Sequence, residues 1–149
     1  MGENFLIALL AVFVAGIAIA TQAPMNARLG GSLGDGLAAA MVSFGVGFLL
    51  LLILVIARGT MPDTEQIRAV PWWAWSGGAL GAYYVWTAIY GVPRLGVLSL
   101  TAALILGQLV GSLLLDAFGA FGLPVRGLDW QRVLAALLVA AGVALSLFR

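Results

Sequence analysis

Polar and aromatic side chains recur inside three otherwise apolar stretches of this chain, and they are its best candidates for binding a small molecule. Their spacing of three, four or seven residues is the spacing that places side chains on one face of a helix. The predicted binding residues are Gln22, Asn26, Ser76, Tyr83, Trp86, Thr87, Thr101, Gln108 and Ser112.

These side chains suggest recognition of a polar or cationic organic molecule. Amide and hydroxyl groups orient the polar atoms of a ligand, and the rings of Tyr83 and Trp86 can attract an organic cation. The alternative is that each polar side chain makes a hydrogen bond between helices, worth about 0.6 kcal/mol. Because three stretches carry such side chains, we predict one shared polar cavity with aromatic walls.

The ionisable chemistry of the chain is sparse. Asp116 lies one helical turn beyond Ser112 and is a possible coupling residue, or else the partner of a nearby arginine or loop amide. Gly30 to Gly34 match the G-x-S-x-G pattern of a nucleophile elbow, but there is no histidine to act as base. There is also no cysteine and no P-loop. We therefore expect no enzyme, no metal and no cofactor.

The elements that position these residues must lie in lipid. Of the 149 residues, 63% are hydrophobic and only 9% are charged. A soluble domain has roughly 25% charged residues. The few charges of this chain cannot cover a globule in water. We predict an all-α integral membrane protein, with residues 1–149 forming a single transmembrane domain.

Five apolar segments have about the 20 residues that a transmembrane helix needs. Polar or charged residues separate them, and no arginine, aspartate or glutamate falls in the middle of any segment. No basic residue precedes the first segment, so we expect a permanent helix there and not a cleaved signal peptide. The segments are about 5–23, with its end near Pro24, and 37–57, 72–90, 95–115 and 130–148.

Residues at the ends of these segments support the assignment. Asp35 precedes the second segment and Asp129 the fifth, where a carboxylate can accept hydrogen bonds from free backbone amides. The starts of the third and fifth segments carry tryptophans, as indole anchors at the headgroup level do. They are Trp72, Trp73, Trp75 and Trp130.

The arginines barely favour one orientation. With five crossings the termini lie on opposite sides, and one side carries four arginines while the other carries three. Arginine and lysine asymmetry normally fixes orientation. Either the bias is weak and the first helix decides the orientation, or copies of the chain insert in both orientations, which is dual topology. The two sets are Arg58, Arg68, Arg126 and Arg132 against Arg28, Arg94 and Arg149.

Small residues mark the predicted helix contacts. Gly77 and Gly81, and Gly107 and Gly111, form small-xxx-small pairs that let helices approach closely or bend. Packing within the chain is one interpretation of these pairs. For residues 130–148, which carry alanines and no polar side chain in their middle, a contact between subunits is the favoured one.

The chain resembles the YdcZ-type five-helix family of the drug/metabolite transporter superfamily, which is related to EamA-like and small multidrug resistance transporters. The resemblance spans nearly the whole chain and rests on a set of short motifs in the right order. They are Gln22 and Asn26, Trp75–Gly81, Pro93–Gly96, Gly107–Gln108 and Asp116–Gly122.

The resemblance implies half of a ten-helix, inverted-repeat transporter. An antiparallel homodimer, or a pair with a paralogous subunit, would supply the second half, and such repeats commonly provide alternating access to a site at the midplane. Small multidrug relatives have an acidic residue in the middle of the first helix. This chain has no acid between Glu3 and the end of that segment, so proton-coupled cation export is not expected.

We therefore expect a multi-pass protein of the bacterial inner membrane that exports small organic metabolites or drugs and binds no nucleic acid. Membrane lipid and the substrate are the other expected partners. Two alternatives remain open: a flippase for lipids or lipid-linked carriers, and a non-transporting subunit that stabilises a partner.

Overall fold

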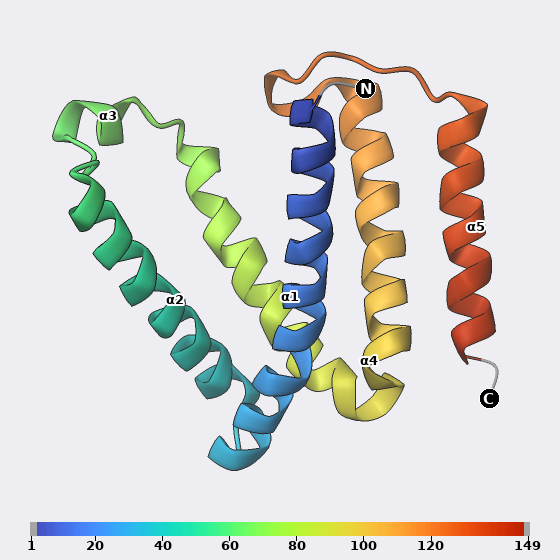
Figure 1. Ribbon diagram of the computed structural model, residues 1–149, viewed down its shortest axis with the longest axis horizontal. Coiled ribbons are helices and arrows are strands. Elements are labelled where there is room, and N and C mark those ends of the chain that lie inside the picture. The colour runs from blue at the N-terminus through green and yellow to red at the C-terminus, as the bar shows by residue number, and fades with distance from the viewer. Residues whose placement is uncertain (1–2, 148–149) are drawn as a thin grey trace. The chain divides into compact units, whose positions relative to one another are not determined.

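The computed structural model describes residues 3–147, all of whose regular elements are helices (Figure 1). The residues outside the described part are Met1, Gly2, Phe148 and Arg149. They include the last residue of the segment expected at 130–148. The helices are α1 (Glu3–Leu33), α2 (Gly36–Arg58), α3 (Thr64–Ala69), η1 (Trp72–Ser76), α4 (Gly77–Phe118), η2 (Ala120–Gly122) and α5 (Trp130–Leu147).

Among the described residues, four stretches are long and apolar enough to cross a membrane: Ile7–Leu33, Gly36–Arg58, Trp72–Phe118 and Trp130–Leu147. Large apolar side chains along them are exposed. Phe13 is 65% exposed and Phe48 is 64% exposed. Such a surface is unfavourable in water and suits lipid, so the all-helical membrane protein expected from the sequence is confirmed.

The expected end of the first helix is wrong. The sequence placed it at residue 23, but α1 continues through Pro24 to Leu33. Proline lacks one backbone donor and usually bends a helix in water, yet transmembrane helices tolerate it because neighbouring groups satisfy the freed carbonyl. The helix ends instead before Gly34, whose φ of 72° is accessible to glycine at little cost.

The expected boundary between the third and fourth segments is also displaced. Helical backbone does not stop at residue 90 but runs past Pro93, and the break falls at Gly96, with φ 74° and ψ 166°. This conformation is almost restricted to glycine. The start differs too, since Trp72–Ser76 form the 3₁₀ helix η1 before the α-helix begins.

The chain divides into two compact units at residues 93 and 94, within α4. The first unit contains α1, α2, α3, η1 and the beginning of α4. Its core is formed by Ala39 and Ala40 of α2 with Val85 and Ile89 of α4, and Leu29 of α1 packs against them. The second unit contains the rest of α4, η2 and α5.

Capping explains where α2 begins. The Asp35 carboxylate accepts hydrogen bonds from the amides of Leu37 at 2.6 Å and Ala38 at 2.9 Å, which confirms the predicted cap. At the start of α5 the backbone carbonyl of Asp129 accepts from the amides of Arg132 and Val133, both at 3.1 Å.

Candidate functional site

A groove between α1 and α2 brings together the polar side chains of the first unit. It has a volume of about 580 Å³, and Gln22 and Asn26 of α1 line it opposite Ser43 of α2. An adjoining groove of about 380 Å³ shares Gln22 and Ser43 and is also lined by the rings of Phe44 and Phe48. The two predicted residues of α1 therefore lie on one surface, together with a hydroxyl from the next helix.

Asn26 is the most enclosed polar residue of this groove. It is 7% exposed, and within residues 3–147 its side-chain amide makes no hydrogen bond. Gln22 is exposed into the groove. Thr21 also lines it, but its hydroxyl donates to the carbonyl of Ile17 at 2.8 Å and is committed to its own helix.

The local sequence explains why these groups meet. Gln22 and Asn26 are four residues apart and share a face of α1. Farther along α1, Gly30 lets Ile89 of α4 approach so closely that an added Cβ would lie 2.8 Å from its Cγ2 atom. The same Cβ would lie 3.7 Å from the Cβ of Ala39 on α2. Small residues thus hold the helices together beside the groove.

Sequence reasoning missed Ser43, although a usable signal was present. Apart from Arg58 at its end, Ser43 is the single polar side chain of α2, in a helix of otherwise apolar residues. A lone polar side chain in an apolar helix is that signal, although the spacing rule that selected Gln22 and Asn26 cannot reveal it.

A second, aromatic groove lies between α2 and the beginning of α4. Its volume is about 370 Å³, and Met41 and Phe44 of α2 line it together with Tyr83 and Trp86 of α4. The rings of Tyr83 and Trp86 are tilted by 48° with their centroids 6.3 Å apart. Phe44 borders both this groove and the one that contains Gln22, so its ring forms a shared wall.

The other predicted residues of the first unit do not line these grooves. Ser76 ends η1, where its hydroxyl donates to the carbonyl of Trp73 at 2.7 Å. The hydroxyl oxygen of Thr87 is buried and has no hydrogen-bond partner among the described residues. A Cβ on Gly81 would lie 3.3 Å from Phe44, whereas one on Gly77 would have no neighbour within 4 Å.

The second unit holds the remaining predicted residues on α4. Thr101 is half-buried, and Gln108 and Ser112 are exposed. Within this unit nothing lies within 4 Å of a Cβ placed on Gly107 or Gly111.

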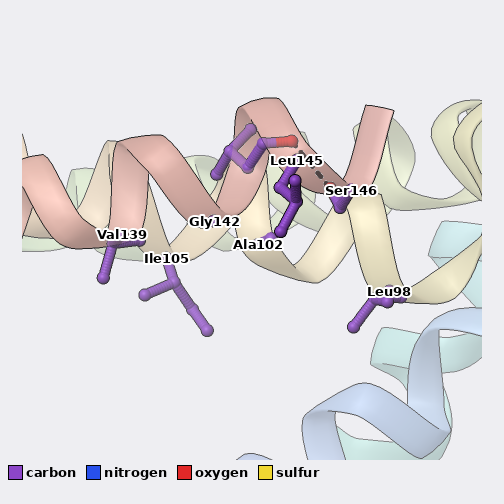
Figure 2. A pocket seen from close by; sticks show the side chains of 8 residues that line it. Leu98, Ala102, Ile105, Val139, Gly142, Leu145 and Ser146 are labelled. Atoms are coloured by element: carbon purple, nitrogen blue, oxygen red, sulfur yellow. Dashed lines mark hydrogen bonds between the residues drawn. The ribbon is translucent and has the colours of Figure 1, made fainter. Parts of the chain in front are cut away.

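An apolar groove of about 590 Å³ also lies in the second unit, between α4 and α5 (Figure 2). Leu98, Ile105 and Val139 are among its lining residues, and Thr101, Gln108 and Ser112 are not. Beside it the Ser99 hydroxyl donates to the backbone carbonyl of Ser146 at 3.1 Å. The Ser146 hydroxyl donates to the backbone carbonyl of Val143 at 2.8 Å.

Asp116 forms an ion pair with Arg132 across the connection between α4 and α5. Its backbone carbonyl accepts from the amide of Arg126 at 2.9 Å, and Arg132 also donates to the carbonyl of Gly127 at 3.3 Å. These contacts agree with the interpretation of Asp116 as the partner of a nearby arginine, which holds the connection between α4 and α5 in place.

Comparison with known proteins decides the family. Residues 7–145 match the family described as "Putative inner membrane exporter, YdcZ". The chain belongs to the YdcZ family. It is 31% identical over 129 residues to the inner membrane protein YdcZ of Escherichia coli (strain K12), a match that covers 86% of this chain and 85% of that protein. No solved structure matches the chain.

Membership in the YdcZ family, together with the apolar helices, makes this chain a multi-pass protein of the inner membrane. The family is one of membrane exporters, so the chain is grouped with transporters and not with enzymes.

Proposed function

We propose that this chain is a secondary exporter of small organic molecules that works as an antiparallel pair of subunits by alternating access. The observation that carries the proposal is the match of residues 7–145 to a family of inner membrane exporters. The second subunit is an identical chain in the opposite orientation or a paralogue.

Five crossings are the first requirement of the proposed half-transporter. The stretch Trp72–Phe118 has 47 residues. As one straight helix it would be about 70 Å long, which is over twice the thickness of the bilayer core. The stretch is interrupted at Gly96. This break leaves two segments of about 20 residues, each sufficient for one crossing. With one crossing each for α1, α2 and α5, the proposed total is five.

The near balance of four arginines against three supports insertion in both orientations, because it gives the insertion machinery little to distinguish the two sides. Two opposed copies then form the inverted repeats that, in many transporters, provide outward-open and inward-open states around one site. The α1–α2 groove and the adjoining aromatic groove supply the binding residues in each subunit.

The absence of cysteine from the sequence gives a clean test of orientation. Thr60→Cys, beyond the end of α2, and Ser32→Cys, near the end of α1, are made separately and labelled in spheroplasts with a membrane-impermeant maleimide. We expect about half of each population to react, as an equal mixture of orientations requires. Full labelling at one position and none at the other would contradict the antiparallel homodimer.

Export itself is tested by growth. Cells that overproduce the chain are challenged with toxic aromatic compounds that are neutral, cationic or anionic. We expect higher tolerance to at least one class, and loss of that tolerance in the Asn26→Leu variant with unchanged protein level. Unaltered tolerance to every class, together with copurification of one stoichiometric partner, would favour the non-transporting subunit instead.

A second candidate function, lipid flipping, is supported by the apolar groove between α4 and α5, whose lining suits an acyl chain. Proteoliposomes that contain fluorescent phospholipid in both leaflets test it, by following the fraction accessible to dithionite. Accelerated exchange relative to empty liposomes would support flipping, and an unchanged rate would exclude it for that lipid.

A further inference from the structure

We propose that the α1–α2 groove selects uncharged molecules that carry a carboxamide or a similar neutral hydrogen-bonding group on an apolar body. This inference rests on the proposed export function and names the class of its substrate. It depends on three features of the groove: an amide that lines it without a partner among the described residues, the lack of charge, and an apolar wall of aromatic rings.

The unpaired amide is that of Asn26. A primary amide has two donor hydrogens and an acceptor oxygen, and in an apolar groove these groups gain from a ligand that can bond to them. Asn26 is 7% exposed and makes no hydrogen bond within residues 3–147. Its amide keeps accessible surface in the groove, since Thr87 Oγ1 is the one fully buried side-chain atom without a partner among these residues. A ligand that donates and accepts at the same time satisfies the Asn26 amide, and a carboxamide does both.

Two further groups extend this polar strip. Gln22 lies one turn before Asn26 on α1, and Ser43 faces the groove from α2. Together they offer donors and acceptors on both sides of a bound polar group. The neighbouring hydroxyl of Thr21 adds little, because it already donates to the carbonyl of Ile17.

Among the residues that the structure describes, no ionisable side chain lines either part of the groove. Arg28 is only two residues beyond Asn26, but that step carries it to the other side of α1, and it is exposed. A charged group at membrane depth is costly unless it is paired. A cation or an anion therefore finds no counterion here, whereas a neutral polar group loses little.

The rest of the groove suits an apolar body. Phe44, Phe48 and Leu51 border the smaller part, and Val42, Val46 and Leu29 border the larger part. Their volumes of about 380 Å³ and 580 Å³ fall within the range of small-molecule sites. An aromatic or branched aliphatic body beside the polar group fills such a space.

Three probes of nearly the same shape and different charge test the proposal: 4-fluorobenzamide, 4-fluorobenzoate and 4-fluorobenzamidinium. Their binding to the full chain in lipid nanodiscs is measured by fluorine NMR line broadening, with empty nanodiscs as the reference for partition into lipid. We expect the neutral amide to bind at least roughly tenfold more tightly than either ion.

Variants assign that binding to the groove. Asn26→Leu keeps the size and removes the amide, and we expect it to weaken binding of 4-fluorobenzamide roughly tenfold. Gly31→Ala is the control, because it changes the same helix outside the lining of the groove, where nothing lies within 4 Å of an added Cβ, and it should leave binding unchanged. Each variant is first shown to be folded by its circular dichroism and its elution as a single species.

The outcomes separate the two proposals. Equal or tighter binding of either ion, or full binding of the amide by Asn26→Leu, overturns the neutral selectivity while export and dual orientation stand on their own tests. Amide binding that depends on Asn26, in a chain that inserts one way and exports nothing, supports the groove and overturns the exporter.

Discussion

The side chain of Ile89 on α4 lies against the backbone of Gly30 on α1, with its Cγ2 atom 2.8 Å from the place a Cβ on Gly30 would occupy. Gly30 is buried, and so is Ala39 of α2 on its other side. Three helices of the first unit therefore meet at a residue that has no side chain. Since lipid removes the hydrophobic drive between helices, this close approach is a main source of their association.

Gly30→Ala should consequently destabilise the first unit. The new methyl group would clash with Ile89, whose β-branched side chain is stiff and cannot easily move aside. We expect a loss of about 1–3 kcal/mol, measured by unfolding in mixed micelles. Gly31→Ala is the matched control, since nothing lies within 4 Å of its Cβ, and it should be neutral or slightly stabilising. Equal effects of the two changes would show that the contact with Ile89 is unimportant.

Gly96 should be the glycine of α4 least tolerant of substitution. It has a φ of 74° and a ψ of 166°. A side chain makes this conformation costly, by about 1–3 kcal/mol. We expect Gly96→Ala to lower the thermal stability and the yield of folded protein, because the break in α4 would straighten. Gly78→Ala, in regular helix with open space around it, serves as the control. If Gly96→Ala proved as stable as Gly78→Ala, the break would not depend on this residue.

Much of the helical architecture was predictable because its signals are local. Asp35 precedes an apolar run, and it caps α2 as expected. The end of α1 was not predictable in this way, since Pro24 stops helices in water but is accommodated in this one. The break near Pro93 was recognised, yet it lies at Gly96, because glycine and not proline provides the unusual backbone conformation.

The candidate site was predictable in part, for a different reason. Gln22 and Asn26 were found by their spacing on one helix, but their neighbour Ser43 belongs to another helix, and spacing within one helix cannot reveal it. The partner of Asp116 was likewise open among nearby arginines and loop amides. It is Arg132, which lies 16 residues away and is brought close only by the folding of the connection. Joint binding by Thr101, Gln108 and Ser112 stays a prediction.

The ion pair between Asp116 and Arg132 should contribute modestly to stability. Their side chains are 25% and 29% exposed, so the pair is neither fully solvated nor fully buried. We expect a coupling of about 1 kcal/mol in a double-mutant cycle of Asp116→Ala and Arg132→Ala, measured by unfolding in micelles. A chain that carries both Asp116→Arg and Arg132→Asp should recover part of the loss. Additive single effects would show that the two residues do not stabilise each other.

Removing arginines from one side should convert dual insertion into a single orientation. Arg58 ends α2 and Arg68 lies in the last turn of α3, so both belong to the side that carries four arginines. Changing both, together with Arg126 of the same side, to glutamine leaves one arginine against three, and the side that keeps Arg28 and Arg94 should then become cytoplasmic. Paired C-terminal reporters, one active in the cytoplasm and one outside, measure the shift. Changing the same three arginines to lysine keeps the charge and should keep both reporters active. If the glutamine variant still gave equal signals, charge balance would not be what sets the orientation of this chain.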